Sequence, residues 1–367
     1  MDGKIILKKV MIIGLGLIGG SLAKALRQAI PDLHITGVGD NKKFLMQSKD
    51  EGTLTDWYLE LPDEIEEEVI FLCTPIEVSL EFCEKLVRIS SPSVIITDVC
   101  STKTEIVEYF TQKEIELGRR IRFIGGHPMA GSEKSGYLAS NVYLFENAYY
   151  IISPLKSTQD DDLKLIKNII GLIGAIPFIL DAREHDVALA RISHLPHVVA
   201  AALVNTAFMK ETNEGYLKLL AAGGFKDITR IASGNPQLWE TICSSNKANL
   251  ASAIDDIIRI LSDFKENLVG DSSQMEKYFT SARDYRSSFR DGIATISNMM
   301  YELNVDVADK PGAIAEISTQ LYNAGINIKN IYICGNRDNE GGQLRLVFSS
   351  KNDIELATKL LSLNGKI

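Results

Sequence analysis

Five histidines provide most of the acid–base chemistry that this chain can perform near neutral pH. His127 stands between Gly126 and Pro128 after an apolar run, which predicts a position at the carboxyl end of a strand. A histidine held there would face a ligand cleft, and its near-neutral pKa suits a general base. The residues alone also allow a hydrogen-bonded histidine with a purely structural role. His34 precedes another apolar run and is expected at the surface.

Three further histidines, His185, His194 and His197, fall within 13 residues. The His-x-x-His spacing of the last two would place both imidazoles on one face of a helix. A metal site is the alternative interpretation of this cluster. We expect no metal, because no cysteine lies nearby and no third ligand is evident in the sequence.

Paired glycines and an arginine follow in the segment Gly223–Ala232. Gly223 would let the backbone approach a ligand closely. Arg230 carries a planar fork of N–H donors that matches a carboxylate, although an ordinary ion-paired arginine would leave the same sequence. Trp239, one of two tryptophans, is most simply a core residue.

A glycine-rich turn near the start of the chain predicts a dinucleotide site. Gly14, Gly16 and Gly19 form a G-x-G-x-x-G pattern that follows an apolar strand, with Leu17 and Ile18 opening the helix that comes next. The first glycine makes the tight turn, the second lets the backbone approach a pyrophosphate, and the third lets helix and strand pack closely. The amino end of the helix would then face the phosphates.

Polar residues after three later strands extend this predicted cofactor site. Asp40 ends the next strand, where a carboxylate accepts hydrogen bonds from ribose hydroxyls and repels a 2′-phosphate, so NAD is favoured over NADP. Thr74 and Asp98 follow two further strands and are expected at the same edge of the sheet. Asp98 could instead serve only as a strand-ending cap.

The first 180 residues alternate strand-like and helix-like segments. The predicted strands are short and rich in valine, isoleucine and phenylalanine: Val10–Gly14, Ile35–Asp40, Val69–Pro75, Val94–Val99, Phe123–Gly126 and Ala148–Ser153. Segments such as Ser21–Gln28 and Glu77–Ile89 have helical spacing. This alternation predicts an α/β, doubly wound, parallel sheet of the Rossmann type over residues 1–180.

The character of the sequence changes in its second half. Residues 181–292 contain long helical patterns, which predict an all-α second domain whose apolar faces suit a homodimer. Residues 297–367 show the order strand–helix–strand–strand–helix, typical of a ferredoxin-like α+β sandwich. Tyr301, Leu303, Val305 and Val307 alternate along its first strand and are expected to share one face.

Composition limits the kinds of partner. The net charge of -9 argues against nucleic acid, because the chain offers no basic stripe for phosphates. The 5 cysteines form no C-x-x-C pair, as expected of reduced thiols in a cytoplasmic protein. We expect no membrane span, since we find no apolar stretch of about 20 residues.

Taken together, the motifs resemble the prephenate dehydrogenase family. The segments that carry the resemblance span nearly the whole chain: Gly14–Gly19, Asp98–Lys103, Gly126–Glu133, Ser193–His197 and Gly223–Arg230. In the last 70 or so residues, Asp-Lys-Pro-Gly-Ala at 309–313 and Gly-Ile-Asn-Ile at 325–328 resemble an ACT domain, a small regulatory module that often binds amino acids.

The resemblance implies roles for particular residues. His127 matches the catalytic histidine that takes a proton from the ring hydroxyl, and Ser101 matches a serine that hydrogen-bonds that histidine and the substrate. Arg230 matches an arginine that binds a substrate carboxylate. Further substrate-side positions are implied for His194, His197, Gly223, Glu133 and Trp239.

The implied reaction is the NAD-dependent oxidative decarboxylation of prephenate to 4-hydroxyphenylpyruvate, with no metal. The implied inhibitor is tyrosine, acting either at the ACT domain or at the active site. Arogenate dehydrogenase is the nearest alternative. A hydroxy-acid oxidoreductase, which Lys247 only faintly suggests, and a non-catalytic NAD and amino-acid sensor are more distant ones.

Overall fold

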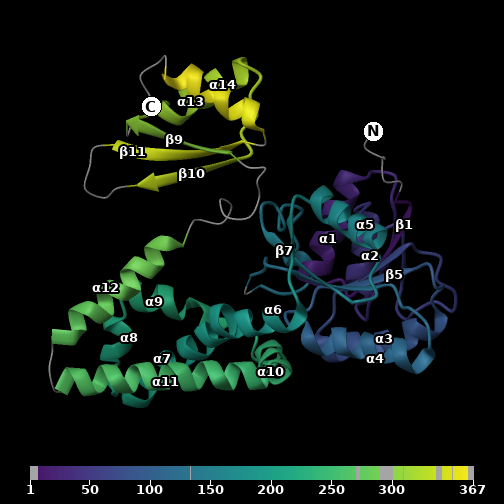
Figure 1. The fold of residues 1–367 in the computed structure, drawn as a ribbon, viewed down its shortest axis with the longest axis horizontal. Helices are drawn as coiled ribbons and strands as arrows, with labels where there is room; N and C mark the ends of the chain where they lie inside the picture. Colours follow the sequence, from purple (N-terminus) through teal and green to yellow (C-terminus); the bar gives the residue numbers. More distant parts are fainter. Residues whose placement is uncertain are drawn as a thin grey trace. The chain divides into compact units, whose positions relative to one another are not determined.

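A computed structural model describes residues 7–132, 134–269, 273–289, 301–308, 310–335, 341–348 and 350–362. The chain forms two compact units, residues 1–266 and 267–367 (Figure 1). Each unit has a hydrophobic core of its own.

The first unit is built on a mixed sheet with strand order β3-β2-β1-β4-β5-β6-β7-β8. Its strands among the described residues are β1 (Lys9–Ile13), β2 (His34–Val38), β3 (Asp56–Tyr58), β4 (Val69–Leu72), β5 (Ile95–Asp98), β6 (Phe123–Pro128), β7 (Tyr149–Pro154) and β8 (Ile176–Ile179). The first six run parallel, in the order typical of dinucleotide-binding sheets.

The prediction of a parallel sheet is wrong for β7, which pairs antiparallel with β6. Parallel neighbours need a crossover connection, usually a helix. The described residues between these two strands form only the short 3₁₀ turn Tyr137–Ala139, so the chain returns in the opposite direction. β8 then pairs parallel with β7 after the helix α5 (Asp160–Leu172).

Helices cover both faces of this sheet. On β1, Val10 and Ile12 belong to one core cluster with residues of α1 (Leu17–Ala29) and α5. Met11 and Ile13 belong to a second cluster with residues of α3 (Ile76–Ile89) and α4 (Thr104–Leu117). Alternate residues of a strand point to opposite faces, so an unbroken apolar run is what a strand buried on both sides requires. α2 (Lys42–Asp50) lies between β2 and β3 in the chain.

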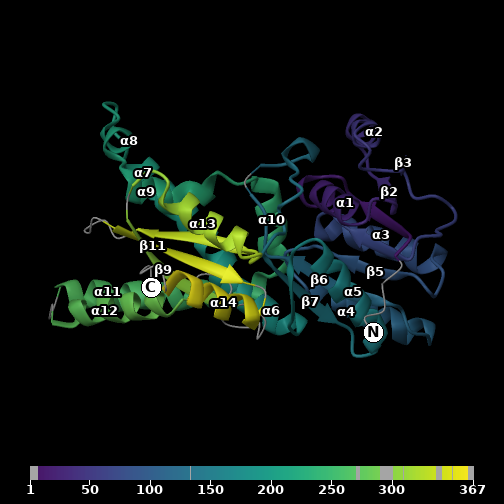
Figure 2. The same ribbon diagram turned by 90° about the horizontal axis from the view of Figure 1, so that it is seen from above.

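A helical segment completes the first unit, as predicted. Its helices are α6 (Ala182–Leu189), α7 (Leu195–Lys210), α8 (Tyr216–Leu220), α9 (Gly223–Thr229), α10 (Pro236–Ser245) and α11 (Lys247–Val269). α6 contacts α4 and α10 contacts α3, so the helices adjoin the sheet layer (Figure 2).

A π-helical turn, Ala190–His194, joins α6 to α7 without a break. Pro196 lies two residues past this turn. It has no N–H for the helical hydrogen bonds, and its ring would crowd the carbonyl four residues earlier. Opening the helix into a wider turn accommodates this proline, and such turns often occur at functional sites. His194 is the last residue of the turn.

The continuous helix Ala182–Lys210 has 29 residues, with a window of mean hydropathy 1.6 of which 22% is buried. By length and composition alone it could cross a membrane, but the core helix of a soluble protein can have the same length and composition. Its exposed apolar side chains include Leu203, Val204, Phe208 and Met209.

The second unit contains α12 (Ser273–Ser288), followed by β9 (Tyr301–Ala308), α13 (Ala313–Asn323), β10 (Asn330–Gly335), β11 (Gly341–Phe348) and α14 (Lys351–Ser362). The three strands form an antiparallel sheet in the order β10-β11-β9, and α13 and α14 lie together on one face of it (Figure 1). Leu303 and Val305 of β9 are buried in the core between sheet and helices, as their alternation predicts.

Candidate active site

The glycine-rich turn lies where the strand order reverses, between β1 and β4. Gly14 has φ 96°, and a Cβ there would lie 2.6 Å from the carbonyl oxygen of Cys73. A Cβ on Gly19 would lie 2.0 Å from the carbonyl oxygen of Gly14. A Cβ on Gly16 would meet no protein atom within 4 Å. The first and third glycines are therefore required by the fold, whereas the second leaves space for a ligand.

A pocket of about 590 Å³ opens at this switch point. Gly16, Leu17, Ile18 and Thr74 line it, as predicted for the cofactor site. Helix α1 begins here without a side-chain cap, so its first N–H groups can receive an anion. The residues present thus fit a dinucleotide. Asp40 is exposed and lies just past β2, at the same edge of the sheet.

Asp98 is fully buried and does not line this pocket. Its carboxylate accepts hydrogen bonds from the backbone N–H of Cys100 at 2.9 Å and of Gly126 at 3.0 Å, and it pairs with the ammonium of buried Lys103. The geometry therefore favours the alternative role of Asp98 as a residue that caps the end of a strand. It ends β5 and holds the loop that carries Ser101.

A second pocket, of about 440 Å³, adjoins the first. Ser101 and His127 line both pockets. The predicted substrate residues that line the second one are His194, His197, Arg230 and Trp239. Gly223 is exposed at the start of α9 and does not line either pocket. Glu133 lies outside the described residues.

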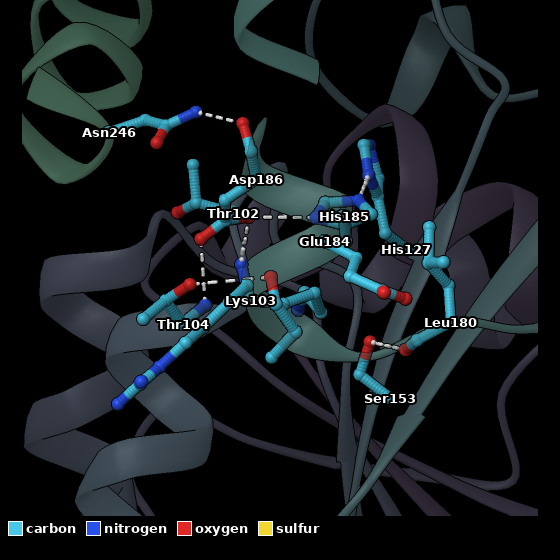
Figure 3. Close-up of polar contacts among 12 residues, drawn as sticks. Thr102, Lys103, Thr104, His127, Ser153, Leu180, Glu184, His185, Asp186 and Asn246 are labelled. Atoms are coloured by element: carbon cyan, nitrogen blue, oxygen red, sulfur yellow. Dashed lines mark hydrogen bonds and ion pairs between the residues drawn. The ribbon is translucent and has the colours of Figure 1, made fainter. Parts of the chain in front are cut away.

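His127 lies at the carboxyl end of β6 and is linked to α6 through a second histidine (Figure 3). Its Nδ1 is 2.9 Å from Nε2 of His185, and Nδ1 of His185 is 2.7 Å from the Asp186 carboxylate. The same carboxylate accepts hydrogen bonds from the backbone N–H groups of Lys103 and Thr104, each at 2.8 Å. A chain of hydrogen bonds therefore runs from the start of α4 to the pocket.

Burial sets the protonation of these groups. It lowers the pKa of His127 well below its usual value, and electrostatic interactions with His185, Lys103 and His194 lower it further. Burial alone would raise the pKa of Asp186, but the hydrogen bonds from His185, Thr104 and Lys103 outweigh it, so this pKa is lowered. The pocket thus contains a neutral imidazole supported by an ionised carboxylate.

His194 is also fixed by a neighbouring side chain outside the pocket lining, Asn246. Its Nδ1 is 3.2 Å from the Nδ2 atom of Asn246, which donates a 2.8 Å hydrogen bond to the main-chain oxygen of Asp186. Burial lowers the pKa of His194 to about 4. His194 is therefore neutral at physiological pH.

His197 stacks on the indole of Trp239, with ring centroids 3.6 Å apart and an interplanar angle of 27°. A Cβ on Gly234 would lie 2.8 Å from Nε1 of Trp239, so that glycine makes room for the indole. Burial lowers the pKa of His197, and neighbouring Arg230 lowers it further. Trp239 is therefore a wall of the pocket rather than a core residue.

Sequence reasoning missed His185, Asp186, Lys103 and Asn246 as parts of the site. A signal was present in the adjacent His-Asp pair, but only the fold brings it to His127. Among the described residues, no group of three or more His, Cys, Asp or Glu side chains could hold a metal ion.

Comparison with known sequences identifies the domains. The model of the prephenate dehydrogenase nucleotide-binding domain matches residues 22–177, and that of the prephenate dehydrogenase dimerization domain matches 181–282. The ACT domain model matches residues 301–361. A prephenate dehydrogenase of Bacillus subtilis is 36% identical over 355 residues, covering 96% of this chain and 95% of that protein.

Solved structures give the same result. Prephenate dehydrogenase from Aquifex aeolicus, crystallised with hydroxyphenyl propionate and NAD+, matches with a TM-score of 0.72 and 33% identity, over 77% of this chain and 99% of that one. An arogenate dehydrogenase from Synechocystis matches with a TM-score of 0.66 and 31% identity, over 76% and 99%. The predicted fold class and family are confirmed, and the chain belongs to the prephenate dehydrogenase family.

Proposed function

We propose that the chain oxidatively decarboxylates prephenate to 4-hydroxyphenylpyruvate with NAD. One observation carries the proposal. The dinucleotide pocket and the imidazole-rich pocket share Ser101 and His127, so a base lies where cofactor and substrate would meet. Family membership and the NAD+ complex of the Aquifex relative support the same cofactor.

The reaction needs a base beside the substrate hydroxyl. Unprotonated His127 takes the proton from the hydroxyl on C4 of the ring, and Ser101 hydrogen-bonds the same oxygen. NAD, when bound, supplies a hydride acceptor for the hydrogen on C4. The ring carboxylate leaves as carbon dioxide, its bonding electrons enter the ring, and the ring becomes aromatic. The proton taken by His127 returns to the ring oxygen and gives the hydroxyl group of 4-hydroxyphenylpyruvate. His127 is suited to this step because burial keeps it neutral.

The remaining pocket residues position an anionic substrate. Arg230 receives a carboxylate through its planar fork. Lys134 lines both pockets and adds a positive charge. His194, His197 and Trp239 form the wall against the ring. Holding the substrate in a fixed orientation supplies much of the rate.

On the cofactor side, Gly16, Leu17 and Ile18 would hold the pyrophosphate, and Gly14 and Gly19 shape the turn. Asp40 accepts hydrogen bonds from the adenosine ribose, which favours NAD over NADP. Thr74 lines the same pocket just past the carboxyl end of β4 and would contact the bound cofactor.

Arogenate is the second candidate substrate, because the Synechocystis relative is an arogenate dehydrogenase. The formation of reduced nicotinamide, followed by absorbance with each substrate, tests the proposal. We expect turnover of prephenate. Turnover of arogenate alone would change the substrate and keep the site, whereas binding of NAD without turnover of either would indicate a sensor.

The ACT domain suggests regulation by tyrosine. Tyrosine would have to bind one conformation more tightly than another. Removing residues 297–367 tests this: we expect tyrosine to inhibit the full chain but not the truncated one. Equal inhibition of both would place tyrosine at the active site.

The helical segment forms a homodimer in this proposal, with domains at 1–180, 181–292 and 297–367. The family model for residues 181–282 is described as a dimerization domain, and exposed Leu203, Val204, Phe208 and Met209 on α7 provide apolar surface to cover. Sedimentation at micromolar concentration should give twice the chain mass of 40.5 kDa. We assign the protein to the cytoplasm because its described cysteines are free thiols.

A further inference from the structure

Asp186 is linked to both pocket histidines by separate routes. Its side chain contacts His185, which contacts His127, and its main-chain oxygen accepts a hydrogen bond from Asn246 (Figure 3). Asn246 in turn contacts His194. The carboxylate already accepts two backbone N–H bonds, from Lys103 and Thr104. An ionised carboxylate has no proton to donate. The 2.7 Å contact to Nδ1 of His185 therefore requires the proton to lie on that nitrogen.

When His185 carries only this Nδ1 proton, its Nε2 has a lone pair. Nδ1 of His127 lies 2.9 Å from this Nε2 atom, so it donates the hydrogen bond to it. The proton of neutral His127 is then on Nδ1, which leaves Nε2 as an acceptor. Free histidine side chains favour the opposite form, with the proton on Nε2.

The second route runs through Asn246. The Oδ1 atom of this amide accepts a 2.8 Å hydrogen bond from Nδ2 of Asn249, which orients its NH2 group toward Asp186 and His194. One amide proton goes to the main-chain oxygen of Asp186, at 2.8 Å, and the other points to Nδ1 of His194, at 3.2 Å. Nδ1 of His194 is therefore an acceptor, and its proton lies on Nε2.

We propose that Asp186 is a positioning residue that fixes opposite tautomers on the two pocket histidines, with His127 presenting an Nε2 acceptor and His194 presenting an Nε2–H donor. On the proposed function, the acceptor receives the proton of the substrate hydroxyl, and the donor hydrogen-bonds a substrate oxygen. His185 and Asn246 transmit the two effects. The π-helical turn Ala190–His194 ends at His194, which lines the same pocket as His127.

Nitrogen NMR of the full chain labelled with ¹⁵N-histidine tests the tautomers directly. Five histidines give few resonances, and single His→Gln variants assign them. At pH 7.5 we expect His127 with its proton on Nδ1 and His194 with its proton on Nε2. The reverse assignment of either ring, or a doubly protonated His185, would overturn the proposal. The tautomers are read from the native protein, and the variants serve only to assign its resonances.

Kinetics of Asp186→Asn provide the second test. If the amide NH2 faces His185, the proton of His185 moves from Nδ1 to Nε2. His185 then donates a hydrogen bond to Nδ1 of His127, and the proton of His127 lies on Nε2, where the acceptor is needed. We expect kcat for prephenate to fall at least about 100-fold with a small change in KM, and the His127 resonances to reverse. Asp181→Asn is the matched control, because Asp181 only caps the same helix α6 through the N–H groups of Arg183 and Glu184.

The two tests separate this inference from the proposed function. Expected tautomers without turnover of prephenate would refute the function and leave the positioning role intact. Turnover of prephenate by a protein whose His127 has its proton on Nε2 would refute the inference alone. An unchanged kcat in Asp186→Asn would also refute it.

Discussion

The Nδ1 atom of His127 lies 2.9 Å from Nε2 of His185. The first residue belongs to β6 of the sheet and the second to α6, the first helix after the sheet. The orientation of the proposed base therefore depends on how the helical segment packs on the dinucleotide-binding layer. Asp186 reinforces this dependence, because it binds the start of α4 and the histidine at the same time.

Two glycines of one turn should respond differently to the same substitution. Gly16→Ala adds a methyl group where no protein atom lies within 4 Å, so the melting temperature should not change. The methyl group would occupy the space of the pyrophosphate, and the Kd for NAD should rise about tenfold, or about 1.4 kcal/mol. Calorimetric titration and thermal melting measure both effects.

Gly19→Ala is the matched comparison. Its Cβ would lie 2.0 Å from a backbone oxygen, so the variant should lose about 3 kcal/mol of folding free energy. A Gly16→Ala protein that binds NAD normally would show that the cofactor does not approach this backbone.

Arg230→Ala should raise the KM for prephenate about 100-fold, or about 2.7 kcal/mol, because it removes a charge-assisted pair with a carboxylate. Arg230→Lys keeps the charge but not the planar fork and should give an intermediate value. The KM for NAD should not change in either variant, since Arg230 lines only the imidazole-rich pocket. Steady-state kinetics measure both KM values. Equal increases in the KM for prephenate and the KM for NAD would contradict the assignment of Arg230 to the substrate carboxylate.

Stability should fall in mild acid because His194 is buried in its neutral form. The unfolded chain binds this proton below pH about 6.5, whereas the folded protein binds it only below pH about 4. The protein therefore has its full free energy of unfolding above about pH 6.5 and loses part of it as the pH falls toward 4. In His194→Gln, the loss of unfolding free energy between pH 7.5 and 5 should be smaller by about 2 kcal/mol.

Urea denaturation at the two pH values measures this difference. His34→Gln is the control, because His34 is partly exposed and its imidazole lies 3.5 Å from the carboxylate of Asp56. Identical acid sensitivity in His194→Gln and in the unmodified chain would show that His194 titrates normally.

The pH dependence of turnover should reflect the lowered pKa of His127. A general base works in its unprotonated form, so kcat/KM falls only when the pH drops below the pKa of the free enzyme's base. We therefore expect a constant kcat/KM for prephenate from pH 8 down to 6.5 and a decline below. A decline centred at or above pH 6.5 would contradict a buried, neutral base.

The sequence predicted the parts of the fold that follow from local patterns. Apolar runs identified the central strands, and three glycines identified the cofactor turn. The antiparallel direction of β7 was missed because direction depends on whether the connection crosses the sheet. Strands β3 and β8 were missed because their residues are partly exposed and resemble loops.

The site was predicted residue by residue but not as a network. His127, His194 and Arg230 were identified by their residue types and motifs, and the structure brings them to one pocket. The sequence predicted Asp98 as a cofactor ligand. Its buried ion pair with Lys103 depends on the tertiary fold and could not be predicted from the local sequence. The contact between His127 and His185 joins residues 58 positions apart and could not be read from spacing.

The most direct test of the account is the rate of NAD reduction by prephenate in His127→Asn. We predict that kcat falls about 1,000-fold while the Kd for NAD is unchanged, because only the base is removed. His34→Asn, at the amino end of β2 and therefore at the opposite edge of the sheet, should retain full activity. Retention of most of the prephenate turnover by His127→Asn would contradict the assignment of this histidine as the base.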